Sequence, residues 1–188
     1  MAKNIKKGSS ILDIGCGTGM FGDHVHRKCK YKGIDINESF INHAKKKGLN
    51  VSLHDIFNFK EYLKKFDVIV ICDVLHHIHP KHKLLLEKIK NYANKIIICE
   101  PYDIPQKQNK EDELSILERI LIILDSDGRN PLHLKSNKRW WYTKENLKIF
   151  FKESFKNRKS LLLKEINGDI IAIYNFKNSN LDCSLLKG

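Results

Sequence analysis

The sequence predicts an α/β fold organised around a parallel β-sheet. Residues 11–19 have the sequence ILDIGCGTG, an apolar run with one acid, followed by three glycines at every second position. Such a run is typical of a buried strand, and the glycines let the backbone turn tightly and approach a ligand. A helix-compatible run follows at residues 20–28. Residues 66–72, FDVIVIC, are nearly all apolar, which is typical of a central parallel strand. Parallel sheets of this kind bind ligands at the carboxyl ends of their strands.

The glycine loop alone is compatible with two classes of ligand. Residues 17–22 also match the dinucleotide pattern G-x-G-x-x-G. Asp13, however, precedes the loop, where its carboxylate would repel a pyrophosphate at the helix N-terminus. S-adenosylmethionine has no phosphate, and its sulfonium and ammonium groups are cationic, so an acid at this place favours it. The alternative without a ligand is a simple glycine turn.

Residues 11–19 closely resemble motif I of the class I S-adenosylmethionine-dependent methyltransferases, of the small-molecule (methyltransferase-11 or UbiE-like) type. The resemblance covers roughly residues 8–176. It implies a Rossmann-like seven-stranded sheet in the order 3-2-1-4-5-7-6, with strand 7 antiparallel and helices on both faces. One domain is expected over residues 1–188. The first set of expected cofactor contacts is Asp13, Gly15, Cys16, Gly17 and Gly19.

The second predicted strand, residues 31–37, ends at an acid about twenty residues beyond the glycines. In sites for adenosyl cofactors, an acid at this place accepts hydrogen bonds from the ribose hydroxyls. We therefore expect Asp35 to bind the ribose, with Ile36 beside it. An exposed aspartate at a strand end is the plainer interpretation.

A helix is predicted at residues 38–47, and the alternating segment 51–56 predicts a third strand. In the family that the sequence resembles, an acid at the end of this strand bonds the exocyclic amine of adenine. The next apolar residue packs on the adenine ring. Asp55 and Ile56 match this pattern.

The segment after the fourth strand, residues 73–80, has the sequence DVLHHIHP. It resembles the motif of small-molecule methyltransferases and lacks the D/N-P-P-Y/F loop of enzymes that methylate base amines in nucleic acids. Asp73 and Val74 are expected near the cofactor. His77 matches a recurrent family histidine and is a candidate general base, with Asp73, His133 and Tyr142 as weaker candidates. A role for His77 in orienting the loop is nearly as well supported.

Four histidines close together raise the question of a metal site: His76, His77, His79 and His82. Imidazole is a common metal ligand. No cysteine or carboxylate completes a recognisable ligand spacing nearby, and the family motif already accounts for the paired histidines. We expect no metal.

The fifth predicted strand, residues 95–101, contains Glu100 near its end. With Asp13, Asp35, Asp55 and Asp73, this glutamate would make the rim of the sheet locally acidic. Carboxylates gathered there could contact a cationic cofactor or its acceptor.

Residues 102–142 interrupt the alternation of strands and helices and are predicted to form a lid-like insertion. Within it, the strongly apolar helix 113–124 should cap the sheet or pair with a second subunit, which leaves monomer and homodimer open. Trp140, Trp141 and Tyr142 could line an acceptor pocket, or anchor the segment on the core. The candidate acceptor contacts are His76, Glu100, Tyr102, Trp140, Trp141 and Tyr142.

The end of the chain predicts a helix and a hairpin. Thr143 is placed to cap a helix over residues 144–154. Two strand-like runs, 161–166 and 169–176, flank Asn167-Gly168, a strong signal for a two-residue turn.

Composition limits the function classes. The chain has 188 residues, 41% of them apolar and 30% charged, as in globular proteins. No apolar run approaches the roughly 20 residues of a membrane span, and no signal segment is recognisable, so we expect a cytoplasmic protein without a membrane partner. The formal charge is +12, but lysine supplies most of the excess and is spread along the chain. A lysine-rich surface is favoured over an RNA-binding face.

The sequence therefore predicts an S-adenosylmethionine-dependent methyltransferase that acts on an O, N or C atom of a small molecule and releases S-adenosylhomocysteine. Three alternatives remain open. They are an RNA-directed methyltransferase, a cofactor-binding module without turnover, and a nucleotide-dependent oxidoreductase.

Overall fold

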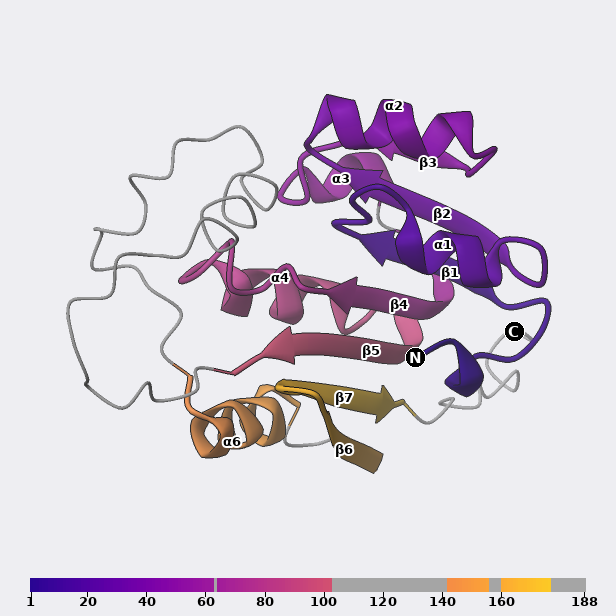
Figure 1. Ribbon diagram of the computed structural model, residues 1–188. Helices are drawn as coiled ribbons and strands as arrows, with labels where there is room; N and C mark the ends of the chain where they lie inside the picture. The colour runs from indigo at the N-terminus through magenta and orange to yellow at the C-terminus, as the bar shows by residue number, and fades with distance from the viewer. Residues whose placement is uncertain (63, 103–141, 156–159, 177–188) are drawn as a thin grey trace, which may run out of the picture.

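Seven strands form one mixed sheet at the centre of the molecule (Figure 1). The computed structural model describes residues 1–62, 64–102, 142–155 and 160–176. The strands are β1 (Ser10–Ile14), β2 (Lys30–Asp35), β3 (Val51–Leu53), β4 (Phe66–Cys72), β5 (Ala93–Pro101), β6 (Ser160–Ile166) and β7 (Asp169–Asn175). Their order is β3-β2-β1-β4-β5-β7-β6. The first five run parallel, and β7 is antiparallel to β5 and β6. The predicted fold class is confirmed.

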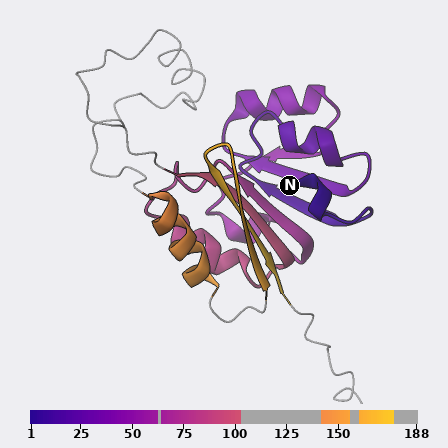
Figure 2. The ribbon, with the colours of Figure 1, turned by 60° about the horizontal axis from the view of Figure 1, so that its bottom comes forward.

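Helices cover both faces of the sheet. They are η1 (Ala2–Asn4), α1 (Met20–Val25), α2 (Glu38–Lys46), α3 (Phe59–Tyr62), α4 (His82–Ile89) and α6 (Lys144–Ser154). Figure 2 shows α1 and α2 on one side of the sheet and α4 and α6 on the other. Each of the described helices is too short or too polar to cross a membrane.

The side chains of each strand alternate between the two faces of the sheet, and each face packs against its own layer of helices. Successive side chains of a strand point to opposite faces. In β1, Ile11 packs in the cluster with α1 and α2, whereas Leu12 packs in the cluster with α4 and α6. Both are fully buried. Strands buried on two faces need apolar residues at consecutive positions, which explains the continuous apolar runs in the sequence.

Side-chain caps fix two helix starts. The Asn37 side chain accepts hydrogen bonds from the backbone N–H groups of Ser39 and Phe40 at the start of α2. The Thr143 hydroxyl accepts one from the N–H of Asn146 at the start of α6, as the sequence predicted. Each bond satisfies a donor that has no partner within the helix.

Several predicted bounds were wrong, most of them by one or two residues, and two of them concern the loops beside the site. The first helix ends at Val25, three residues before the predicted end at residue 28. The third strand ends at Leu53, because Asp55 begins a turn in which its carboxylate accepts a hydrogen bond from the N–H of Phe57, 2.8 Å away. The insertion at 102–142 lies almost entirely outside the described residues, as do helix 113–124, His133, Trp140 and Trp141. The single domain, the lid and the dimer therefore stay predictions.

Helix α6 offers a matched test of the core. Phe151 is fully buried against the sheet, whereas Ile149, two residues earlier, is 52% exposed. Replacing a buried phenylalanine by alanine removes contacts and leaves a cavity, so Phe151→Ala should lower the free energy of unfolding by about 3–5 kcal/mol. Ile149→Ala should change it by less than about 1 kcal/mol. Urea denaturation followed by circular dichroism measures both, and equal effects would contradict this packing.

Candidate active site

The glycine loop between β1 and α1 combines two constrained positions with one open position. Gly15, Gly17 and Gly19 have φ angles of 70°, 52° and 80°, a left-handed conformation that favours glycine. A Cβ atom on Gly15 would lie 2.4 Å from Val74 Cγ2, and one on Gly19 would lie 2.3 Å from Leu49 Cδ1. Around Gly17, by contrast, a Cβ would meet nothing within 4 Å. The backbone at Gly17 therefore borders open space.

Asp35 ties this loop to the end of β2. One carboxylate oxygen accepts a hydrogen bond from the N–H of Gly17 at 2.8 Å, and the other accepts one from the N–H of Asn37 at 2.8 Å. The next residue, Ile36, is an exposed large apolar side chain. A fixed acid, an exposed apolar surface and the open space at Gly17 thus lie next to one another.

Asp13 lies beneath the loop. The sequence suggested a direct contact with a cationic ligand, but the side chain is only 2% exposed and accepts a 2.7 Å hydrogen bond from the Tyr31 hydroxyl. Burial raises the pKa of Asp13 from 3.8 to about 7; the Tyr31 bond opposes this shift and the charge of Asp35 adds to it. Asp13 thus supports the loop from the sheet side.

Cys16 also belongs to the layer beneath the loop. Its side chain is buried, and its thiol lies 3.8 Å from the carbonyl oxygen of Gly17. Burial, with the nearby carboxylates of Asp13 and Asp35, raises the pKa of this thiol. At neutral pH the sulfur is therefore protonated.

Asp55 and Ile56, in the turn after β3, lie in different environments. The Asp55 side chain is exposed, whereas Ile56 is buried in the cluster that includes α4 and α6. The strands β1, β2 and β3 are parallel, so their carboxyl ends lie at the same edge of the sheet. Asp55 and Ile56 therefore follow β3 at the edge where the glycine loop lies.

Glu100 organises the loop after β4. Its side chain is 0% exposed. The carboxylate accepts hydrogen bonds from the backbone N–H groups of Val74, Leu75 and His76 at 2.8, 2.7 and 3.4 Å. A fourth bond joins it to Nδ1 of His76 at 2.9 Å. Direct contact of Glu100 with an acceptor was predicted, but its full burial and these four bonds contradict that prediction.

Asp73 and His76 surround this anchor. Asp73 has a φ of 61°, which is uncommon for a residue with a side chain and is concentrated at functional sites. Its exposed carboxylate lies 3.6 Å from His76 Nδ1. The His77 side chain is exposed, and its ring centroid lies 3.9 Å from that of His76. The predicted catalytic residues His77 and Asp73 are thus brought together around His76.

A metal ion is not needed to explain this cluster. In the part of the chain that the structure describes, Asp73, His76 and Glu100 are the one group of at least three potential ligands whose atoms lie within 4.8 Å of one another. Both oxygens of Glu100 already accept hydrogen bonds, and Nδ1 of His76 faces one of them. The donor set is that of a hydrogen-bonded carboxylate–histidine pair.

The two described aromatic candidates lie apart from this cluster. The Tyr102 hydroxyl donates a 3.0 Å hydrogen bond to Glu165 of the hairpin. Tyr142 packs against Phe150, and its hydroxyl is 3.4 Å from Nε2 of His82. Both tyrosines therefore have structural contacts in the described part of the chain.

A sequence comparison with known protein families agrees with this geometry. Residues 12–95, from β1 into β5, match a family model described as a methyltransferase domain. This match, over less than half of the chain, supports a class I S-adenosylmethionine-dependent methyltransferase.

Two curated relatives of this chain act on different kinds of molecule according to their names. (S)-coclaurine N-methyltransferase of Papaver somniferum is 33% identical over 98 residues, which cover 47% of this chain and 27% of that protein. Probable tRNA methyltransferase 9B of Bos taurus is 32% identical over 92 residues, which cover 49% of this chain and 20% of that protein. The matched region thus spans about a quarter of the length of these relatives.

A solved structure shares the fold of this chain. Magnesium protoporphyrin IX methyltransferase from Synechocystis PCC 6803, crystallised with S-adenosylhomocysteine, has a TM-score of 0.61 at 14% identity. The match covers 94% of this chain and 78% of that chain. At this identity the likeness supports the fold alone.

Sequence reasoning missed the role of His82. This residue is fully buried against Phe150, and burial lowers its pKa to about 4, with His79 and Lys83 adding to the shift. Its spacing from Leu85, Leu86 and Ile89, on the buried side of α4, was the available signal. Lys81 and Lys83 on either side of His82 made this segment look exposed in the sequence.

The raised pKa of Asp13 predicts how stability depends on pH. A carboxyl group with a higher pKa in the folded state stabilises the fold when protonated, below about pH 4. That contribution is lost as the pH rises through 7. Asp13→Asn has no such loss, because the amide stays neutral. Relative to the wild type, the variant should therefore gain stability from pH 5 to pH 8, with a slope of at most about 1.4 kcal/mol per pH unit.

Urea denaturation at several pH values measures this difference. Asp55→Asn, at an exposed carboxylate, controls for the change in net charge. A stability difference between Asp13→Asn and wild type that stays constant from pH 5 to pH 8 would show that Asp13 is ionised throughout.

Proposed function

We propose that this protein transfers a methyl group from S-adenosylmethionine to an O, N or C atom of a small molecule. The observation that carries this proposal is the Asp35 carboxylate, held by the N–H groups of Gly17 and Asn37 beside the open backbone at Gly17. The family supplies the donor, and the residues present fit it.

Asp35 has the capacity to bind a ribose in addition to its backbone partners. Each carboxylate oxygen can accept about two hydrogen bonds, and the structure gives each one backbone donor. The remaining positions can receive the two ribose hydroxyls. In the same proposal, Asp55 accepts from the exocyclic amine of adenine, and Ile36 and Ile56 supply apolar contacts. Val74 packs against Gly15 and thereby fixes the loop.

Positioning is the main contribution of the protein to the reaction. When bound, S-adenosylmethionine supplies an electrophilic methyl group on a sulfonium leaving group. A lone pair of the acceptor forms the new bond to carbon while the carbon–sulfur pair returns to sulfur, and the acceptor's proton goes to a base or to water. Holding the acceptor in line with the methyl group at short distance can account for much of the rate.

His76, oriented by Glu100, is the better placed base in the described residues. An ionised carboxylate only accepts hydrogen bonds, so the 2.9 Å contact requires the proton on Nδ1 of His76. Nε2 is then the basic nitrogen. His77 matched the family pattern, but its ring is exposed and lies tilted against that of His76, whereas Nδ1 of His76 is held by Glu100. Glu100 acts here as a positioning residue.

An RNA acceptor is the second candidate, and one finding favours it: the similarity to probable tRNA methyltransferase 9B. The sequence DVLHHIHP after β4 supports the small-molecule acceptor instead, as does the similarity to (S)-coclaurine N-methyltransferase. Tests of turnover should therefore include unmodified tRNA beside small phenols and amines.

The cofactor assignment predicts a specific loss of binding. Calorimetry should show micromolar binding of S-adenosylhomocysteine to the wild type and no binding of NAD. Asp35→Ala should weaken binding at least about ten-fold, because it removes charged hydrogen-bond acceptors. Asp35→Asn should be intermediate, since one oxygen remains. Glu87→Ala, at an exposed carboxylate of α4, is the control.

Circular dichroism should accompany these measurements, since Asp35 also bonds the backbone. Undiminished binding by Asp35→Ala would exclude the ribose assignment. Binding of NAD in place of S-adenosylhomocysteine would favour an oxidoreductase.

The base assignment predicts different results for the two histidines. With a phenol or amine acceptor that the wild type methylates, His76→Ala should lower the single-turnover rate by about 10²–10⁴-fold and abolish the acid limb of the pH–rate profile. His77→Ala should change the rate only a few-fold. Glu100→Gln should move the acid limb to lower pH, because an amide does not stabilise the imidazolium. A greater loss in His77→Ala than in His76→Ala would reverse the assignment.

A further inference from the structure

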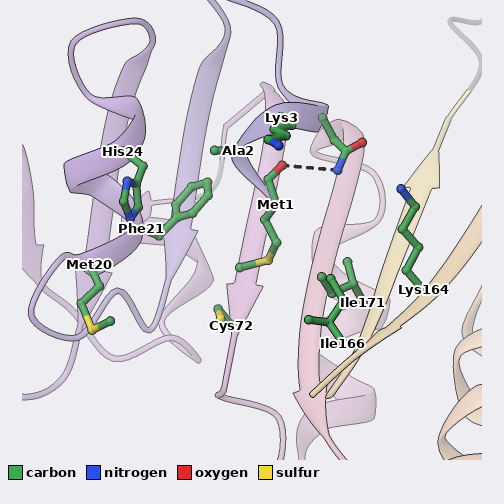
Figure 3. Close-up of a pocket in the computed structure, with 11 residues that line it drawn as sticks. Met1, Ala2, Lys3, Met20, Phe21, His24, Cys72, Lys164, Ile166 and Ile171 are labelled. Carbon is green, nitrogen blue, oxygen red and sulfur yellow. Dashed lines mark hydrogen bonds between the residues drawn. The ribbon is translucent and has the colours of Figure 1, made fainter. Parts of the chain in front are cut away.

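A groove crosses the α1 face of the sheet between α1 and the β6–β7 hairpin. Its volume is about 560 Å³, within the usual range for small-molecule sites. Figure 3 shows Phe21 pointing from α1 toward Met1, with Ile166 and Ile171 on the hairpin side. Most of the side chains along it are apolar: Met1, Met20, Phe21, Cys72, Ile166 and Ile171.

The groove leads to the glycine loop. Met20, in its wall, directly follows Gly19. Cys72, on its floor, ends β4 and directly precedes Asp73 and Val74, the residue that packs against Gly15. A molecule in the groove would therefore have one end beside the proposed cofactor site.

Backbone register defines the other end. Cys72 pairs with Cys99, which pairs with Ile171, which pairs with Lys164 on the edge strand β6. The groove thus extends across four strands, from the end of β4 to the edge of the sheet.

Charge along the groove is entirely positive in the described residues. Its lining includes Lys3 and Lys164 and contains no carboxylate. Glu165, next to Lys164 on the hairpin, is already paired: its carboxylate lies 2.7 Å from Nζ of Lys144 and 3.8 Å from Nζ of Lys148, both on α6. The side chain of Lys164 makes no hydrogen bond or ion pair with another residue in the described ranges. Its ammonium group remains available to an anion.

Large apolar surfaces meet solvent in this groove. Met20 is 73% exposed, and Ile166 is also exposed. Covering such surface is favourable by about 25 cal/mol per Å². Methionine side chains are flexible and adapt to ligands of different shape.

We propose that this groove binds the methyl acceptor, and that the acceptor is an apolar organic acid. Its apolar body lies between Phe21 and the hairpin, its carboxylate pairs with Lys164, and its nucleophilic atom lies at the Cys72 end. The inference rests on the proposed function and specifies the substrate class for it.

The test uses two matched probes that carry the hydroxyl and the acid group at opposite ends of an apolar ring system, 6-hydroxy-2-naphthoate and its neutral amide, 6-hydroxy-2-naphthamide. Calorimetry is performed on the full chain saturated with S-adenosylhomocysteine. The wild type should bind the acid about two- to five-fold more tightly than the amide, the range expected for one exposed ion pair. Lys164→Gln should remove this preference, and Lys148→Gln, on α6, should retain it. Equal binding of acid and amide by the wild type, or an unchanged preference in Lys164→Gln, overturns the proposal.

Methionine labelling locates the probe. The chain has two methionines, Met1 and Met20, and both line the groove. With ¹³C-methyl methionine, 6-hydroxy-2-naphthoate should shift the Met20 resonance, which Met20→Leu identifies by its disappearance. Binding of the acid without this shift overturns the proposal. Binding of S-adenosylhomocysteine is measured separately, so a failure of the proposed function is recognised by loss of cofactor binding in the wild type.

Discussion

The buried carboxylate of Glu100 is the interaction on which the active-site side of the sheet depends. It lies on β5 but receives its hydrogen bonds from the loop that follows β4. A fully buried carboxylate is costly unless donors surround it, and here three backbone N–H groups and one imidazole do so. Asp73 can therefore keep its uncommon backbone conformation, and Val74 can pack against the glycine loop.

A second carboxylate plays the corresponding part on the other side of β1. Asp35 bonds the loop and the start of α2. Together with Val74 and Glu100, it joins the ends of four neighbouring strands, β2, β1, β4 and β5. These contacts between neighbouring strand ends hold the rim together. Of the five acids predicted at the rim, Asp55 and Asp73 are exposed to solvent.

Local sequence patterns predicted most of the fold and only part of the site. Continuous apolar runs, the glycine loop and the Asn167-Gly168 turn depend on neighbours in sequence, and family resemblance added the strand order. The orientations of the Asp13 and Glu100 side chains depend on hydrogen-bond partners far along the chain. Tyr31 is 18 residues from Asp13, and Val74 is 26 residues from Glu100. His82 was missed for the same reason, because its burial comes from Phe150 on α6. The groove likewise joins residues of η1, α1, β4 and the hairpin.

The protonated thiol of Cys16 has a consequence for chemical selectivity. A thiolate next to a bound sulfonium would be a competing nucleophile, and the protein would methylate itself. Burial and two carboxylates hold this sulfur in its thiol form, in which it reacts poorly. The sulfur beneath the loop is therefore a poor nucleophile toward an electrophile bound above it.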